Sequence, residues 1–204
     1  MKFLHLGLSV CTLLCGLNLV GCGPTPSKVT RVDAQQQIDL SGKWNDSDAQ
    51  QVSATMVNTC LNDPWIGNFV AAAGRQPVIV VGTIYNKTDE HISSDVFIKD
   101  LERAFIQTNR ARVVQGGAAV DELRAIRQDQ QDFASAATRK RLREEVGADF
   151  VIQGTINKVL DADAKRYVYF YQIDLEMIDL ESTEKIWLGQ EKLKKYVEKN
   201  RYVF

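Results

Sequence analysis

Apolar side chains occupy every second position of the segment Tyr167–Met177, and this alternation constrains the fold more than any other feature of the sequence. Successive side chains of a strand point to opposite faces of its sheet, so this strand has one apolar face. The positions between them become polar towards the end of the segment: Gln172, Asp174 and Glu176. The pattern is typical of an antiparallel strand with one covered face and one solvated face. Val168 and Phe170 make the second face apolar near its start, and we assign that patch to the core rather than to an interface.

This strand is the middle one of a predicted three-stranded meander in the last third of the chain. The preceding strand begins at Phe150–Ile152 and turns at Asp161–Asp163. The chain turns again at Leu180–Thr183, and Ile186–Leu188 forms the final strand. Consecutive strands that are joined by short polar turns are expected to pair with each other in an antiparallel sheet.

Further upstream, a second pattern predicts parallel pairing. The apolar run within Pro77–Thr83 is typical of a buried strand, and turn residues follow it. A helix capped by Ser93 or Ser94 then runs to about residue 108 and places Phe97, Leu101 and Phe105 on one stripe. A second short strand follows at Ala111–Val114. A strand, a helix and a second strand predict a parallel crossover connection.

Other segments have the period of helices. The form Ser47-x-x-Gln50 predicts a capping box that opens a helix running to about residue 61, and Pro64 limits its end. We expect a loop over 65–74 and two helices over 118–128 and 135–146, the second with Gly147 as its C-cap and with Leu142 and Val146 facing inward. The predicted fold class is α/β (α+β), with a single mixed sheet of about five strands and flanking helices.

The first 22 residues match a secretory signal followed by a lipidation motif. Lys2 gives a short cationic start, and an apolar run follows over 3–19. The sequence Leu19-Val20-Gly21-Cys22 resembles the lipobox of bacterial lipoproteins. That resemblance implies that Cys22 carries diacylglycerol and becomes the first residue of the mature chain. A transmembrane helix is the alternative, but the run is interrupted and shorter than the roughly 20 residues that a span requires.

Gly23, rather than aspartate, follows the lipidated cysteine. An aspartate there resembles the signal for retention in the inner membrane, so its absence predicts a lipid anchor in the outer membrane, with the domain facing the periplasm. Residues 23–45 contain little to bury, and as a coil they would average about 25–30 Å end to end. We therefore expect a signal peptide over 1–21, the lipidated cysteine and a flexible tether over 22–45, a globular domain over 46–195 and a C-terminal tail over 196–204.

Composition and cysteine usage exclude several classes of function. The whole chain has 25 basic and 26 acidic residues, so removal of Lys2 leaves a formal charge of −2. That balance lacks the basic surface expected of a nucleic-acid-binding protein. Once the signal is removed and Cys22 is acylated, Cys60 has no cysteine with which to form an intramolecular disulfide. Cys60 lies at helical spacing from Val52 and Met56, so we expect a buried core thiol.

The sequence offers little chemistry for catalysis. His91 is the only histidine after removal of the signal, and no HExxH, CxxC, Walker A or GxGxxG motif occurs. Asp161 and Asp163 are too few carboxylates for a calcium loop. We therefore predict that the protein is not an enzyme and has no catalytic residue, no metal site and no cofactor.

Several short stretches together resemble the penicillin-binding protein activator LpoB family of outer-membrane lipoproteins. The resemblance covers Leu40 to Lys195. The stretches that carry it are Asp39–Asp46, Val80–Thr88, Phe97–Ala104, Gly147–Phe150, Gln153–Ile156 and Lys185–Gly189. The family fold is similar to the N-terminal domain of TolB. The resemblance implies a non-enzymatic partner protein that binds and activates a class A penicillin-binding protein and so regulates peptidoglycan synthesis.

Two other functions remain open from the sequence. The first is a pore-forming secretion lipoprotein similar to CsgG, which would need strands of about 9–11 residues to cross a bilayer. Only Tyr167–Met177 is long enough, and Asp174 and Glu176 interrupt its second face. The second is a generic periplasmic scaffold lipoprotein. Family members with longer Pro-rich tethers reach further than this chain, so its short tether limits where a synthase can be engaged.

The turn after the first strand is the predicted partner-binding site. It consists of four polar residues: Asn86, Lys87, Thr88 and His91. In open α/β sheets, ligands bind at the ends of the strands, and this turn follows a buried strand. A solvated connection without a binding role is the alternative.

Overall fold

The structure is a computed structural model that describes residues 28–34, 36–141 and 144–199. The chain divides into two units, residues 1–36 and residues 37–204. The predicted signal peptide, Cys22 and residues 200–204 of the predicted tail lie outside the described residues. In the first unit, residues 28–34 and 36 contain no helix or strand, and the Gln36 N–H donates to the Asp33 carbonyl over 3.1 Å.

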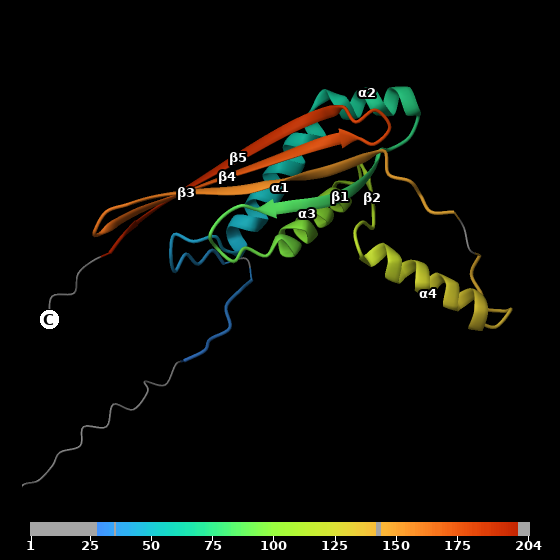
Figure 1. Cartoon of the computed structure of the whole chain (residues 1–204), viewed down its shortest axis with the longest axis horizontal. Helices are drawn as coiled ribbons and strands as arrows, with labels where there is room; N and C mark the ends of the chain where they lie inside the picture. Colours follow the sequence, from blue (N-terminus) through green and yellow to red (C-terminus); the bar gives the residue numbers. More distant parts are fainter. Residues whose placement is uncertain (1–27, 35, 142–143, 200–204) are drawn as a thin grey trace, which may run out of the picture. The chain divides into compact units, whose positions relative to one another are not determined.

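The second unit contains one mixed sheet with helices, as the sequence predicts. In chain order its elements are α1 (Asp46–Asn62), α2 (Pro64–Ala73), β1 (Val78–Asn86), α3 (Ser94–Thr108), β2 (Arg112–Val114), α4 (Ala119–Phe133), β3 (Phe150–Ala162), β4 (Arg166–Asp179) and β5 (Lys185–Glu198). The strand order across the sheet is β2-β1-β3-β4-β5 (Figure 1). β1 is parallel to both β2 and β3, whereas β3, β4 and β5 form the antiparallel meander.

The alternation on β4 determines which face of the sheet is covered. Tyr171, Ile173, Leu175 and Met177 are all buried, and α1 and α3 pack over this side of the sheet. The stripes predicted for these two helices are buried with them: Val52, Met56, Cys60, Phe97, Leu101 and Phe105. The core therefore lies between two helices and one face of the sheet. At about 25 cal/mol per Å² of apolar surface, this burial is the main term that stabilises the fold.

The assignment of Val168 and Phe170 to the core is wrong. Both side chains are half-buried, and they lie outside the cluster of buried residues. They alternate with Tyr169 and Tyr171, so they point to the face of the sheet away from α1 and α3. No described helix packs over that face at this part of β4, and the two side chains stay in partial contact with solvent.

Two connections differ from their predictions. The predicted loop over 65–74 is the helix α2, because Pro64 starts a new helix in addition to ending α1. The Asp63 side chain accepts a hydrogen bond from the Trp65 N–H, and Gly74 ends the helix in the left-handed region. The helix α1 is also capped two residues earlier than predicted, by a capping box between Asn45 and Asp48.

The predicted helix over 135–146 is also wrong, since its described residues form only a turn and an irregular segment. Arg124 and Arg127 on α4 both bind Glu145, at 3.0 and 3.1 Å, and so hold this segment against α4. Val146 is exposed rather than buried, and Leu142 lies outside the described residues. Glu145 of this segment thus pairs with the neighbouring helix α4, and the segment does not form the solvated helix that was predicted.

Candidate functional site

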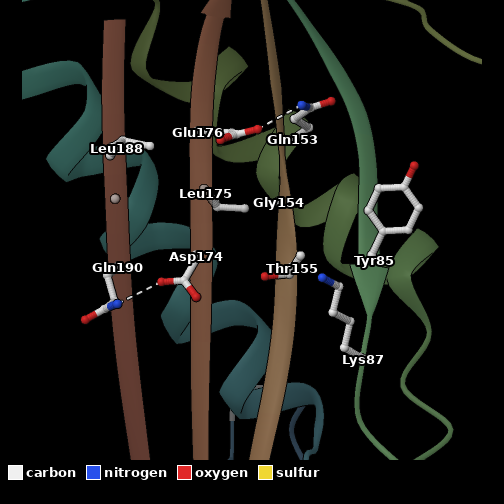
Figure 2. Close-up of a pocket in the computed structure, with 11 residues that line it drawn as sticks. Tyr85, Lys87, Gln153, Gly154, Thr155, Asp174, Leu175, Glu176, Leu188 and Gln190 are labelled. Atoms are coloured by element: carbon white, nitrogen blue, oxygen red, sulfur yellow. Dashed lines mark hydrogen bonds between the residues drawn. The ribbon is translucent and has the colours of Figure 1, made fainter. Parts of the chain in front are cut away.

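The face of the sheet away from α1 and α3 carries a row of hydrogen-bonding side chains, and we name it the open face. Its central part presents Gln153 and Thr155 on β3, Asp174 and Glu176 on β4, and Gln190 on β5. Figure 2 shows these side chains in front of the strands, with the helices behind the sheet. Alternation along three neighbouring strands therefore brings together groups that are up to 37 positions apart in the sequence.

A depression of about 500 Å³ lies in the middle of the open face. Tyr85 and Leu188 border it and are 58% and 69% exposed. Gly154 and Gly189 line it, and a Cβ at Gly154 would lie 2.1 Å from the Asp174 carbonyl oxygen. The close approach of β3 to β4 at this point therefore requires glycine.

The polar groups of the depression pair with one another across the strands. Gln153 Nε2 donates to Glu176 Oε1 over 2.9 Å, and Gln190 Nε2 donates to Asp174 Oδ1 over 2.8 Å. Lys185 also pairs with Glu176, and this contact, followed by that of Gln153, holds the pKa of the Glu176 carboxyl below its usual value. The first of these bonds is part-buried and the second is exposed, so water can replace either one when a partner exchanges it.

The four predicted site residues do not form one cluster. Lys87 is exposed and lines the depression beside Tyr85 (Figure 2). Asn86 Nδ2 donates to the Glu90 carbonyl over 2.8 Å, and the Thr88 N–H donates to Asn86 Oδ1 over 2.9 Å. Asn86 and Thr88 therefore hold the turn in shape. His91 is exposed and does not line the depression.

Glu90 is the centre of a buried polar cluster behind this turn. Its side chain is 8% exposed and accepts from Lys158 Nζ over 2.9 Å and from the Tyr171 hydroxyl over 2.8 Å. The Trp44 N–H donates to the same carboxylate over 3.1 Å. Burial alone would raise the pKa of Glu90, but these donors outweigh it and hold the pKa below its usual value. Burial and the contact with Glu90 raise the pKa of the Tyr171 hydroxyl.

Residues 37–45 form a strap that lies against the domain and leads into α1. Trp44 packs edge-on against Phe97 and Tyr171, with ring centroids 6.2 and 5.6 Å apart. Lys195 Nζ on β5 donates to Asp39 Oδ1 over 2.9 Å and to Asp48 Oδ2 over 2.6 Å. Burial lowers the pKa of Lys195, but the two carboxylates outweigh it and raise the pKa overall. The strap is thereby fastened both to the sheet and, through Glu90, to the turn that bears Lys87.

The cluster around Glu90 was not predicted from the sequence. One signal was available, because Lys158 occupies an inward position in the alternation of the strand that begins at Phe150. Its side chain is only 6% exposed, and a buried lysine requires an anionic partner. Sequence spacing alone could not identify that partner, since Glu90 is 68 positions away.

Two kinds of reactive site, a metal cluster and an ionised thiol, are absent from the described residues. Within residues 28–34, 36–141 and 144–199, no three His, Cys, Asp or Glu side chains are placed to hold a metal ion. Burial raises the pKa of the Cys60 thiol to about 12, so it remains protonated at neutral pH. None of the helices in this part of the chain is long and apolar enough to cross a membrane.

The chain resembles several solved structures at low identity. The lipoprotein GNA1162 from Neisseria meningitidis is 16% identical, with a TM-score of 0.41, over 62% of this chain and 88% of that one. The LpoB C-terminal domain from Escherichia coli is 16% identical, with a TM-score of 0.34, over 65% and 94%. The structure of E. coli LpoB is 14% identical, with a TM-score of 0.39, over 88% and 87%.

The family is established by sequence. Among curated proteins, no relative matches the chain. The profile of the family described as peptidoglycan-synthase activator LpoB, however, matches residues 48–193, which include the depression on the open face and the side chains of Glu90, Lys158 and Tyr171. This match covers more than half of the chain and confirms the resemblance found in its short motifs. The chain belongs to the peptidoglycan-synthase activator LpoB family.

Proposed function

We propose that this protein is a lipid-anchored activator that binds a class A penicillin-binding protein and stimulates its synthesis of peptidoglycan. The family match supports an activator, and the lipobox at Cys22 supports anchorage of the periplasmic domain to the outer membrane. The protein supplies no bond-making group in this proposal. It shifts the synthase towards an active conformation by binding that conformation more tightly.

The observation that carries the proposal is the depression on the open face. It combines two exposed apolar side chains, Tyr85 and Leu188, with hydrogen-bonding groups and the cation of Lys87. Protein interfaces commonly have such a composition, in which an aromatic anchor is surrounded by polar groups. We propose that Lys87 and His91 contact the synthase and that Asn86 and Thr88 position the turn.

The strap limits where the partner can bind. Because Asp39 is fastened to Lys195, the reach of the domain from Cys22 is set by the 15 steps between Cys22 and Gln37. These 15 steps span at most about 50 Å, and as a coil they average about 20–25 Å. The distance from the outer membrane to the docking region of the synthase therefore cannot exceed the reach of these residues added to the size of the domain.

The test is the affinity of the mature chain for a purified class A synthase, together with its effect on glycan polymerisation. Lys87→Ala with His91→Ala, and separately Leu188→Ala, should each weaken binding at least tenfold, or about 1.4 kcal/mol. Lys165→Ala and Leu180→Ala, exposed residues in the two turns of the meander, serve as matched controls. Unchanged affinity in both test variants would remove the open face as the docking site.

Anchorage is tested separately with Cys22→Ser. This variant should leave the membrane fraction and retain its affinity for the synthase in solution. A variant that still floats with outer-membrane vesicles would show that the lipid is not the anchor.

A further inference from the structure

The far end of the meander carries an apolar patch on the open face. This outer patch consists of Val159, Val168, Phe170 and Tyr196, where β3, β4 and β5 pair in register. Val159 is 63% exposed and Tyr196 is 60% exposed, whereas Val168 and Phe170 are half-buried. In Figure 1 the strands continue past α1 and α3 towards this end. The patch is therefore an apolar surface that the described helices do not cover.

Basic side chains lie beside the outer patch. Lys194 is paired with Phe170 in the sheet, and Lys192 precedes it on the same face of β5. Both lysines are exposed, and neither forms an ion pair within the described part of the chain. Arg166 at the start of β4 is bound to Asp163 over 2.5 Å, so Lys192 and Lys194 are the unpaired basic side chains that the described strands present on the face of the patch, beside the Glu198 carboxylate that accepts from Tyr196. Tyrosine, phenylalanine and lysine together are typical of surfaces that rest in lipid headgroups.

The strap brings the tether to this same end of the domain. Lys195, the neighbour of Lys194, binds Asp39, and the strap covers Tyr169 so closely that a Cβ at Gly42 would lie 2.1 Å from its ring. Gln37 lines a groove together with Val197 and Glu198 of β5. The lipid at Cys22 is thus attached, through 15 residues, to the end of the domain that carries the outer patch.

We propose that the outer patch rests on the anionic lipid surface that holds the anchor. The proposal depends on the lipid anchorage proposed above, but not on synthase binding. Each lysine near an anionic surface contributes about 1 kcal/mol. A short tether keeps the patch at an effective concentration in the millimolar range, so a weak intrinsic affinity is sufficient. Tyr196 lies six residues beyond Gln190, or about 20 Å along β5. A membrane contact that involves only this end of the meander therefore leaves the depression free.

The test uses fluorescence on vesicles. The chain from residue 22 carries a hexahistidine tag in place of the lipid, so the result does not depend on natural acylation. It is bound to vesicles that contain nickel-chelating lipid and brominated phosphatidylglycerol, whose bromines quench nearby tryptophan. Tyr196→Trp is compared with Leu188→Trp, which lies on the same face of the same strand and is similarly exposed. The fluorescence of the parent chain is subtracted from both.

We expect the tryptophan introduced by Tyr196→Trp to be quenched at least twice as strongly as that introduced by Leu188→Trp. Brominated phosphatidylcholine, or Lys192→Gln with Lys194→Gln, should reduce this difference. Equal quenching at the two positions, or none at either, would overturn the proposal. So would a Tyr196→Trp signal that stays unquenched on vesicles but becomes shielded when the synthase is added, because the patch would then belong to a protein interface. Synthase affinity is measured independently, so the two proposals can fail separately.

Discussion

On β4, Tyr171 and Ile173 are fully buried beneath the helices, whereas their sequence neighbours Gln172 and Asp174 lie on the open face. Both faces contain hydrogen-bonded carboxylates. On the covered face, the Glu90 carboxylate has three donors and almost no solvent. On the open face, Asp174 accepts from Gln172 and Gln190 in contact with water. The same kind of bond thus holds the fold together on one side and remains exchangeable on the other.

The two faces differ in what can replace a hydrogen bond when its partner is removed. Within the described residues, no buried side-chain nitrogen or oxygen lacks a hydrogen-bond partner. A group on the covered face that loses its partner stays desolvated, at a cost of about 1–3 kcal/mol, or more if it is charged. A group on the open face can bind water instead. Substitutions should therefore affect stability on the covered face and binding on the open face.

The largest expected effect is that of Phe97→Ala on α3. Phe97 is fully buried and contacts the ring of Trp44, so its removal leaves a cavity between the strap and the sheet. We expect the free energy of unfolding to fall by about 3–5 kcal/mol. Urea denaturation measures this change, and Val96→Ala, the exposed neighbour on the same helix, is the control. Equal effects of the two substitutions would contradict the assignment of the covered face.

A smaller effect is expected for Glu90→Gln, and it should depend on pH. The pKa of Glu90 is lowered in the folded state, so the ionised group stabilises the fold above its unfolded pKa of about 4.3. That stability is lost as the pH falls through the folded pKa. The variant should be about 2 kcal/mol less stable than the parent at pH 7, since it leaves Lys158 without one of its charged partners.

The difference between Glu90→Gln and the parent should narrow as the pH is lowered below about 4, because the parent then loses the same charge. Denaturation at a series of pH values measures this convergence. Glu181→Gln in the exposed turn between β4 and β5 is the matched control. A difference that stays constant with pH would mean that the charge of Glu90 is not what stabilises the cluster.

Local periodicity was sufficient to predict most of the fold. The stripe of Phe97, Leu101 and Phe105 and the alternation of β4 are properties of single segments, and both are confirmed. The order of elements also predicted the parallel pairing of β1 with β2. Two of the errors arose at single residues: Pro64 ends one helix and also begins the next, and Glu145 joins its segment to α4 instead of forming a helix.

The candidate site was harder to predict, because it is assembled across strands. Lys87 was proposed as a site residue because its turn follows a buried strand, and its side chain lines the depression directly after β1. Apart from Tyr85, its neighbours in the depression come from three later strands, and their register depends on pairing that the sequence does not display. The polar face of β4 was visible in the alternation, but Gln153 and Gln190, which complete its hydrogen bonds, were not.

The smallest expected effect on stability is that of Asp174→Asn on the open face. The substitution preserves size and removes one charge, and the amides of Gln172 and Gln190 can turn to water when their acceptor weakens. We therefore expect the free energy of unfolding to change by no more than about 0.5 kcal/mol. Urea denaturation at pH 7 measures it beside Phe97→Ala. A loss above about 1 kcal/mol would mean that the hydrogen bonds of the open face stabilise the fold as those of Glu90 do. A surface that needs its own hydrogen bonds to stay folded is poorly suited to exchange them with a partner.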